Sequence, residues 1–140
     1  MKLMERFSKR ARIAIKTPRS AYLYAREIIG GRWCQAELTI MKDPEHAVDY
    51  ALYVMGRWPE AEAIIMKDPR SAFRYARYFI RGRWPEAEPY IRWDRYWAYN
   101  YAKYFIKGRW IEVEPYIMTD KSVAVAYKRD VLDRYANHTC

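Results

Sequence analysis

The sequence predicts an all-α chain, a short α-solenoid of about five two-helix repeats of 25–26 residues. Three observations predict this fold class. One phrase occurs four times, its tryptophans are almost evenly spaced, and an aspartate follows each tryptophan at a fixed distance. A recurring period of this length is typical of stacked helical units. A compact helical bundle is the lesser alternative.

The repeated phrase is GRWPEAE, identical at residues 56–62 and 82–88, with the variants GRWCQAE at 31–37 and GRWIEVE at 108–114. Its tryptophans are separated by 25, 26 and 26 residues, and an aspartate stands ten residues after each of them. The tryptophans are Trp33, Trp58, Trp84 and Trp110, and the aspartates are Asp43, Asp68, Asp94 and Asp120. Because this distance never changes, we interpret the phrase as a joint between two helices.

The second helix of each repeat is expected to begin at this aspartate, or at Thr17 in the earliest copy. Asp43 and Asp68 precede a proline, which is the order typical of an N-cap and the first helical position. Counted from the cap, the fourth residue is always alanine and the seventh is always tyrosine. They are Ala21, Ala47, Ala72, Ala98 and Ala124, and Tyr24, Tyr50, Tyr75, Tyr101 and Tyr127. Both positions lie on one helical face, so we expect them in the core.

The first helix of each repeat is expected to be short. Pro89 and Pro115 would remove a backbone donor from the interior of a longer helix. The helix is therefore short, bent, or begins nearer Glu88 and Glu114. An isoleucine seven residues after each tryptophan is also expected in the core. These isoleucines are Ile40, Ile65, Ile91 and Ile117.

The glycine of the phrase is expected to end the preceding helix by taking the left-handed conformation. These glycines are Gly31, Gly56, Gly82 and Gly108. The two ends of the chain depart from the repeat, as capping units of an array do. We therefore divide a single domain, 1–140, into an N-terminal capping helix at 1–16, repeats at 17–135 and a tail at 136–140.

The consensus DPxxAxxYAxxxIxGRWPEAEPYI resembles tandem repeats of uncharacterised bacteriophage proteins. Its best matches run from Asp68 to Ile91 and from Asp94 to Ile117. The resemblance covers nearly the whole chain and implies a phage-encoded protein in the cytoplasm of an infected bacterium. It further implies a binding role directed at the host, such as an anti-defence role, and it assigns no catalytic residue.

An enzyme is not expected, because no reactive constellation is present. Three phrases hold two glutamates each, Glu60/Glu62, Glu86/Glu88 and Glu112/Glu114. The members of a pair stand two residues apart and would point about 200° apart on a helix, so they do not converge on one substrate atom. We expect one near the helix N-terminus and the other paired with an arginine of the phrase. The arginines are Arg32, Arg57, Arg83 and Arg109. Structural pairing is favoured for them, and a ladder along phosphates is the alternative.

Metal and cofactor sites are not expected either. His46 and His138 lack ligand-like neighbours, and Cys34 and Cys140 lack the spacing of a disulfide framework or a metal motif. The sequence does not predict a binding site for a small-molecule substrate. The longest apolar runs are too short for a membrane span, and the alternating charged and apolar residues at the start do not predict a secretory signal.

The predicted binding surface lies on the exposed face of the second helices, where residues vary between repeats. Its predicted partner-binding residues are Arg70, Arg74, Arg77, Arg81, Tyr78, Trp97, Lys103, Tyr104 and Lys107. Tyr53, Tyr78 and Tyr104 stand at one offset in successive repeats. Such a row can anchor a protein partner, stack on bases, or only fill the contact between repeats.

A non-enzymatic binding protein with a macromolecular partner is therefore the favoured function. A host protein is preferred as the partner because Glu45 and Asp49 interrupt the basic face. The alternative is a nucleic-acid-binding protein that uses the same face and a basic N-terminal helix, which the net charge of +9 favours. The basic residues of that helix are Lys2, Arg6, Lys9, Arg10 and Arg12.

Overall fold

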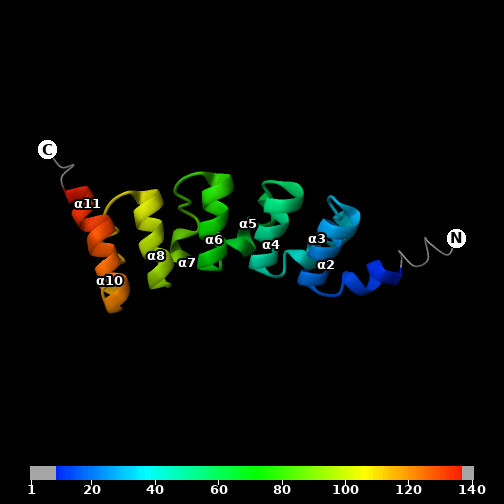
Figure 1. Cartoon of the computed structure of the whole chain (residues 1–140), viewed down its shortest axis with the longest axis horizontal. Coiled ribbons are helices and arrows are strands. Elements are labelled where there is room, and N and C mark those ends of the chain that lie inside the picture. The colour runs from blue at the N-terminus through cyan, green and yellow to red at the C-terminus, as the bar shows by residue number, and fades with distance from the viewer. Residues whose placement is uncertain (1–8, 137–140) are drawn as a thin grey trace. The chain divides into compact units, whose positions relative to one another are not determined.

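The computed structural model describes residues 9–136, which fold into helices and turns without a strand (Figure 1). The chain divides into two compact units, Met1–Ile65 and Met66–Cys140, a division that the sequence pattern does not indicate. In each unit long helices alternate with short ones, so the predicted all-α repeat fold is confirmed. Two predicted features, the basic residues Lys2 and Arg6 and most of the tail, lie outside the described residues.

Each long helix begins as an α-helix of seven residues and continues as a π-helix of five residues. Unit 1 contains α2 (Pro18–Tyr24) with η1 (Ala25–Ile29), and α4 (Pro44–Tyr50) with η3 (Ala51–Met55). Unit 2 contains α6 (Pro69–Tyr75) with η5 (Ala76–Ile80), α8 (Arg95–Tyr101) with η6 (Ala102–Ile106), and α10 (Lys121–Tyr127) with η7 (Lys128–Leu132) and α11 (Asp133–Tyr135). A π-helix is rare, and the sequence pattern does not predict it here.

The short helices begin close to the glutamates of the phrase. They are α3 (Glu37–Ile40), α5 (Glu62–Ile65), α7 (Glu88–Ile91) and α9 (Glu114–Ile117). A 3-10 turn precedes α3 and α5, at η2 (Cys34–Ala36) and η4 (Pro59–Ala61). In α7 and α9 the second residue is proline, where its missing N–H has no helical partner to lose. The prediction of a short helix starting near Glu88 and Glu114 is confirmed.

The predicted N-caps are confirmed in all five long helices, although one cap makes a different contact. The side chains of Thr17, Asp68, Asp94 and Asp120 accept hydrogen bonds from backbone N–H groups in the first turn. Asp43 holds the same extended N-cap conformation, but its carboxylate bonds to Nδ1 of His46 instead.

The predicted left-handed glycine of the phrase occurs in none of the four repeats. The residue with positive φ is the thirteenth from the cap. It is left-handed at Gly30, Arg81 and Lys107, whereas Gly56 combines φ of 91° with ψ of −162°. Only Gly56 belongs to the phrase, because its repeat is one residue shorter. The N–H of this residue bonds to the carbonyl five residues before it, for instance Arg81 to Ala76 at 2.6 Å. The wider π turn thus moves the cap one residue ahead of the expected glycine.

The core is formed by the invariant positions of the repeat. The four isoleucines of the short helices are fully buried, and so are the invariant tyrosines that end α4, α6, α8 and α10, namely Tyr50, Tyr75, Tyr101 and Tyr127. The predicted alanines are fully buried except in α10, where Ala124 is half-buried. Among the tryptophans of the phrase, Trp58, Trp84 and Trp110 are buried and Trp33 is half-buried.

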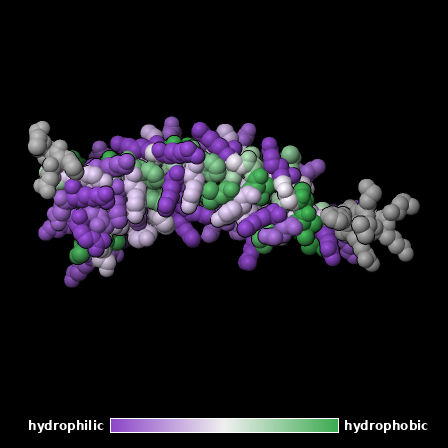
Figure 2. Space-filling model, turned by 45° about the horizontal axis from the view of Figure 1, so that its top comes forward, coloured by the Kyte–Doolittle hydropathy of each residue, from purple (hydrophilic) through white to green (hydrophobic). Residues whose placement is uncertain are grey.

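The long helices pack side by side within each unit, with the short helices between them (Figure 1). In unit 1, α2 contacts α3 and α4, and α4 contacts α5. In unit 2, α6 contacts α7 and α8, and α8 contacts α9 and α10. The face shown in Figure 2 is mostly hydrophilic, with smaller hydrophobic patches between the polar side chains. None of the described helices combines enough length with enough hydrophobicity to span a membrane.

Candidate partner-binding site

The arginines of the phrase are half exposed and pair with glutamates of the same phrase. Each donates to the glutamate five residues later, and Arg32, Arg83 and Arg109 do so with two nitrogens. The pairs are Arg32–Glu37, Arg57–Glu62, Arg83–Glu88 and Arg109–Glu114, at 2.7 to 3.0 Å. The prediction of structural pairing is confirmed, whereas the alternative of a ladder along phosphates stays a prediction.

The same glutamates anchor the next long helix. The hydroxyl of Tyr101 donates to Glu88 Oε1 at 2.8 Å and accepts a hydrogen bond of 2.7 Å from the backbone N–H of Trp84. Tyr50 and Tyr127 repeat this arrangement in their own repeats. One glutamate therefore begins the short helix and also binds the arginine, whereas two separate glutamates were expected. The other glutamate of the pair, such as Glu86, is exposed.

Burial and these hydrogen bonds shift the pKa of the groups involved. Burial raises the pKa of the Tyr50 hydroxyl to about 12, and it raises the pKa of Tyr101 and Tyr127 as well. The hydrogen bond from Arg109 lowers the pKa of Glu114. In this repeat Glu114 is thus held as an anion and Tyr127 as a neutral donor.

A hollow on the surface of unit 2 brings together several of the predicted binding residues. It lies between the long helix of α6 and η5 and that of α8 and η6. It is lined by Phe73, Arg74, Arg77, Tyr78, Tyr96, Trp97, Asn100 and Tyr104. We call it the unit 2 hollow. Within residues 9–136, no group of three His, Cys, Asp or Glu side chains is arranged to hold a metal ion.

The base of the unit 2 hollow is a cluster of aromatic rings around Phe73. Phe73 is buried, and its ring centroid lies 5.2 Å from that of Trp97, 5.0 Å from Phe105 and 6.1 Å from Tyr104. Trp97 also meets Tyr96 edge-on at 5.0 Å. Edge-on and tilted ring contacts at these distances are favourable, so the cluster fixes the position of α8 against α6 and gives the hollow a rigid apolar base.

The rim of the hollow remains available to a partner. Tyr78, Tyr96 and Tyr104 are 50%, 54% and 51% exposed. The guanidinium carbon of Arg77 lies 5.6 Å from the ring centre of Tyr78, and no carboxylate among the described residues forms an ion pair with it. About half of each ring is thus left for a partner, while Tyr104 also packs against Phe73. Whether this row binds a partner or only fills the contact between repeats stays a prediction.

Arg77 stands at a position that contacts the neighbouring long helix in the same way in several repeats. In each case, the ninth residue counted from one N-cap faces the tenth residue counted from the next N-cap. In unit 1, Arg26 stacks on the ring of Tyr53 at 4.6 Å. In unit 2, Arg77 and Tyr104 both line the unit 2 hollow. In the following pair, Lys103 forms an ion pair of 3.3 Å with Asp130.

The structure places five of the nine predicted binding residues in the hollow and four elsewhere. Those in the hollow are Arg74, Arg77, Tyr78, Trp97 and Tyr104. Arg70 lies in the first turn of α6, Arg81 and Lys107 are the left-handed C-caps, and Lys103 faces Asp130. Sequence reasoning omitted Phe73, Tyr96 and Asn100 from this set. The fifth position from each cap is always apolar, and this regularity could have identified Phe73.

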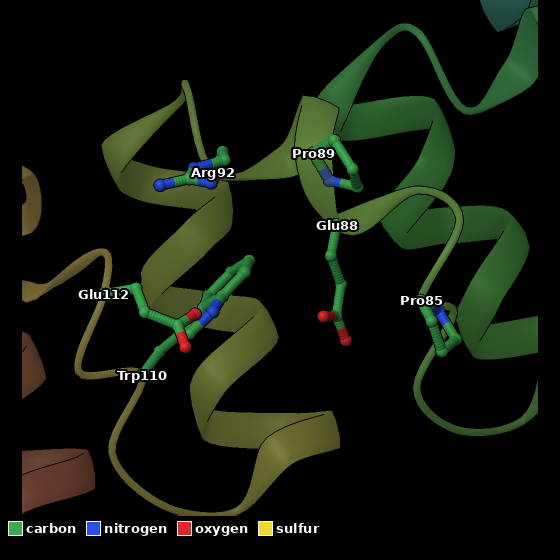
Figure 3. A pocket seen from close by; sticks show the side chains of 6 residues that line it. All are labelled: Pro85, Glu88, Pro89, Arg92, Trp110 and Glu112. Atoms are coloured by element: carbon green, nitrogen blue, oxygen red, sulfur yellow. The ribbon is translucent and has the colours of Figure 1, made fainter.

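A second hollow lies between α7 and the start of the next repeat, and its six lining residues are drawn in Figure 3. The side chain of Glu88 points into the space between Trp110 and the loop that carries Pro85 (Figure 3). Because Glu88 is already bonded to Arg83 and Tyr101, and Trp110 is buried, the walls of this hollow are parts of the joint. We therefore favour the unit 2 hollow as the binding site.

Comparison of the chain with protein-family models, with curated proteins and with solved structures finds no match. The resemblance to bacteriophage repeats accordingly stays a prediction.

Proposed function

We propose that the chain is a non-enzymatic helical-repeat protein that binds a protein partner at the unit 2 hollow. The observation that carries this proposal is the composition of the hollow, an aromatic base with a rim of exposed tyrosines and a guanidinium without a carboxylate partner. Tyr, Trp and Arg dominate the energetics of protein interfaces because they combine a large apolar area with a polar end.

The chemistry of the hollow defines the partner that fits it. Its rim carries Arg74 and Arg77, and the chain as a whole has a net charge of +9. A complementary segment would place an apolar side chain against the base near Phe73 and a carboxylate beside Arg77. The repeats resemble those of bacteriophage proteins, which supports a host protein in the bacterial cytoplasm, such as a defence component, as the partner.

Pairing within the repeat supports a binding role over catalysis. The arginine of the phrase pairs with the last glutamate of the phrase in every repeat, and an enzyme would need one site that differs from the others. What differs between repeats is the set of residues around the hollow. Specificity in repeat arrays resides in such variable surface positions.

The proposal is tested by quantitative capture from a bacterial host lysate, followed by binding measurements with the purified captured protein. The variant Arg77→Ala/Tyr78→Ala changes the rim, and Lys128→Ala/Val125→Ala is the matched control, since both of its residues are exposed on α10 and η7. We expect the first variant to weaken binding of the identified partner by at least tenfold while the control binds as the wild type does. Equal binding by both variants would remove the hollow from consideration.

Nucleic acid remains the second candidate because exposed tyrosines stand beside a guanidinium, an arrangement that stacks on bases and neutralises phosphates. Binding of oligothymidylate across a salt series decides between the two. A nucleic-acid site predicts a steep loss of affinity with salt that becomes shallower in Arg77→Ala/Tyr78→Ala. The absence of binding at low salt excludes this candidate.

A further inference from the structure

A second cluster of aromatic rings and guanidinium groups lies in unit 2 where the turn before α8 meets the turn before α10. It consists of Arg92, Trp93, Arg95 and Tyr116. Trp93 is 68% exposed, the most exposed tryptophan among the described residues. The guanidinium carbon of Arg92 lies 5.6 Å from the ring centre of Trp93, and that of Arg95 lies 4.3 Å from the ring centre of Tyr116.

Hydrogen bonds hold this cluster in one arrangement. Nε of Arg95 donates to Oγ1 of Thr119 at 2.5 Å, and that hydroxyl donates to the carbonyl of Tyr116 at 2.6 Å. The hydroxyl of Tyr116 donates to the carbonyl of Trp93 at 2.9 Å, and the two rings meet edge-on at 6.3 Å. The guanidinium of Arg95 is thus positioned before any ligand binds, which lowers the entropy cost of binding.

The guanidinium groups of the cluster form no ion pair with a carboxylate of the described residues. Arg92 lines the second hollow together with Glu88 and Glu112, but Glu88 is bonded to Arg83 and Tyr101. Asp94 and Asp120, which precede α8 and α10, accept hydrogen bonds from backbone N–H groups of the helices they cap. The terminal nitrogens of Arg95 therefore keep their donors for an external anion, in the fork geometry that matches a carboxylate.

We propose that this cluster is a second binding surface, which takes an acidic protein segment with an aromatic side chain next to its carboxylates. A carboxylate would bind Arg95, with Arg92 beside it, and the aromatic side chain would lie on the exposed ring of Trp93. This surface is distinct from the unit 2 hollow, because none of its four residues lines that hollow.

A protein segment is favoured over a nucleic acid because the cluster does not recur. The positions equivalent to Trp93 hold Lys16, Lys42, Lys67 and Thr119, and those equivalent to Arg95 hold Pro18, Pro44, Pro69 and Lys121. A strand of phosphates is best followed by cations repeated at regular intervals. A single pair of guanidinium groups beside one exposed indole instead provides one anchor point, as protein hot spots do.

The test measures binding of two labelled probes to the full chain, a copolymer of glutamate and tyrosine and a copolymer of glutamate and alanine with the same charge. Arg95→Gln should weaken binding of both probes by about tenfold, and Trp93→Ala should weaken binding of the tyrosine-containing probe alone by about tenfold. Arg95→Lys should not restore wild-type affinity, because lysine lacks the fork and the stacking. Lys121→Gln, which removes one charge at the equivalent position, should bind as the wild type does. Thermal unfolding verifies that each variant is folded.

Three outcomes would overturn the proposal. In the first, Arg95→Gln binds both probes as tightly as Lys121→Gln does. In the second, Arg77→Ala/Tyr78→Ala loses the probes while the cluster variants keep them, which would support the hollow instead. In the third, oligothymidylate or phosphatidylglycerol vesicles bind in a manner that depends on Arg95 while neither copolymer binds.

Discussion

The backbone N–H of Trp84 donates a hydrogen bond of 2.7 Å to the hydroxyl of Tyr101, which stands 17 residues later in the chain. This bond joins the phrase to the middle of the next long helix. The Tyr101 hydroxyl donates a hydrogen bond to Glu88, which also accepts one from Arg83. Trp84, Glu88 and Arg83 of one phrase are thus linked through hydrogen bonds to one tyrosine. The phrase recurs because each repeat uses the same residues to join its short helix to the next long helix.

Removal of the tryptophan from this joint should destabilise the fold. Trp84 is 4% exposed, so Trp84→Ala should lower the free energy of unfolding by about 3–5 kcal/mol through lost burial and the cavity that remains. Trp93→Ala is the matched control, since Trp93 is 68% exposed and its loss should change stability by less than about 0.5 kcal/mol. Urea unfolding followed by circular dichroism measures both. Equal stability of the two variants would contradict the structural role of the phrase.

The repeat pattern predicted the elements that depend on local chemistry and on invariant spacing. The caps at Asp68 and Asp94, the burial of Ile91 and the pairing of Arg83 all follow from residues that recur at fixed offsets. The repeat pattern did not predict the π-helices, because a π turn uses the same apolar residues as an α turn. The left-handed cap at Arg81 was missed for the same reason, since the extra residue in the turn advances the cap.

The candidate site was only partly predictable, because the spacing of residues along one helix does not show which residues of the neighbouring helix they contact. Arg77 and Lys103 occupy the same offset in successive repeats, and the sequence ranked them alike. Their environments differ because the tenth residue of the next helix is Tyr104 in one case and Asp130 in the other. The role of each cation is thus decided by a residue about 27 positions away, across a contact that only the fold reveals.

The two glutamates of one phrase should differ in their contribution to stability. Glu88→Ala removes the acceptor of Arg83 and Tyr101 and leaves a buried hydroxyl without its partner, so we expect a loss of about 1–3 kcal/mol. Glu86→Ala removes an exposed carboxylate from the same phrase and should change stability by less than about 0.5 kcal/mol. Parallel denaturation curves provide the comparison. A larger effect at Glu86 would mean that the paired acids have another role.

Stability should decline at alkaline pH because of the buried tyrosines. Tyr50 is fully buried, and its pKa is raised from 10.0 to about 12 in the folded chain. Between these pH values the unfolded chain has released the proton and the folded chain still holds it, so the free energy of unfolding falls as pH rises. Tyr50→Phe cannot ionise, and its stability should decline less steeply over this range, by at most about 1.4 kcal/mol per pH unit. Denaturation curves recorded from pH 9 upward, with exposed Tyr53→Phe as the control, measure the difference. The same slope in Tyr50→Phe and Tyr53→Phe would show that Tyr50 is not a source of the decline.

Glycine should stabilise the C-terminus of the long helix in the fourth repeat. Lys107 has φ of 55° and ψ of 44°, a left-handed conformation that costs a residue with a Cβ roughly 1–2 kcal/mol. In Lys107→Gly this strain disappears, and the greater freedom of glycine in the unfolded chain offsets about 0.5–1 kcal/mol of the gain. We therefore expect a net stabilisation of about 0.5–1 kcal/mol, measured as a higher urea midpoint. Lys128→Gly places glycine where φ is −58°, within the helix, and should instead destabilise the chain by about 1 kcal/mol. A loss of stability in both variants would show that Lys107 makes a contact worth more than its strain.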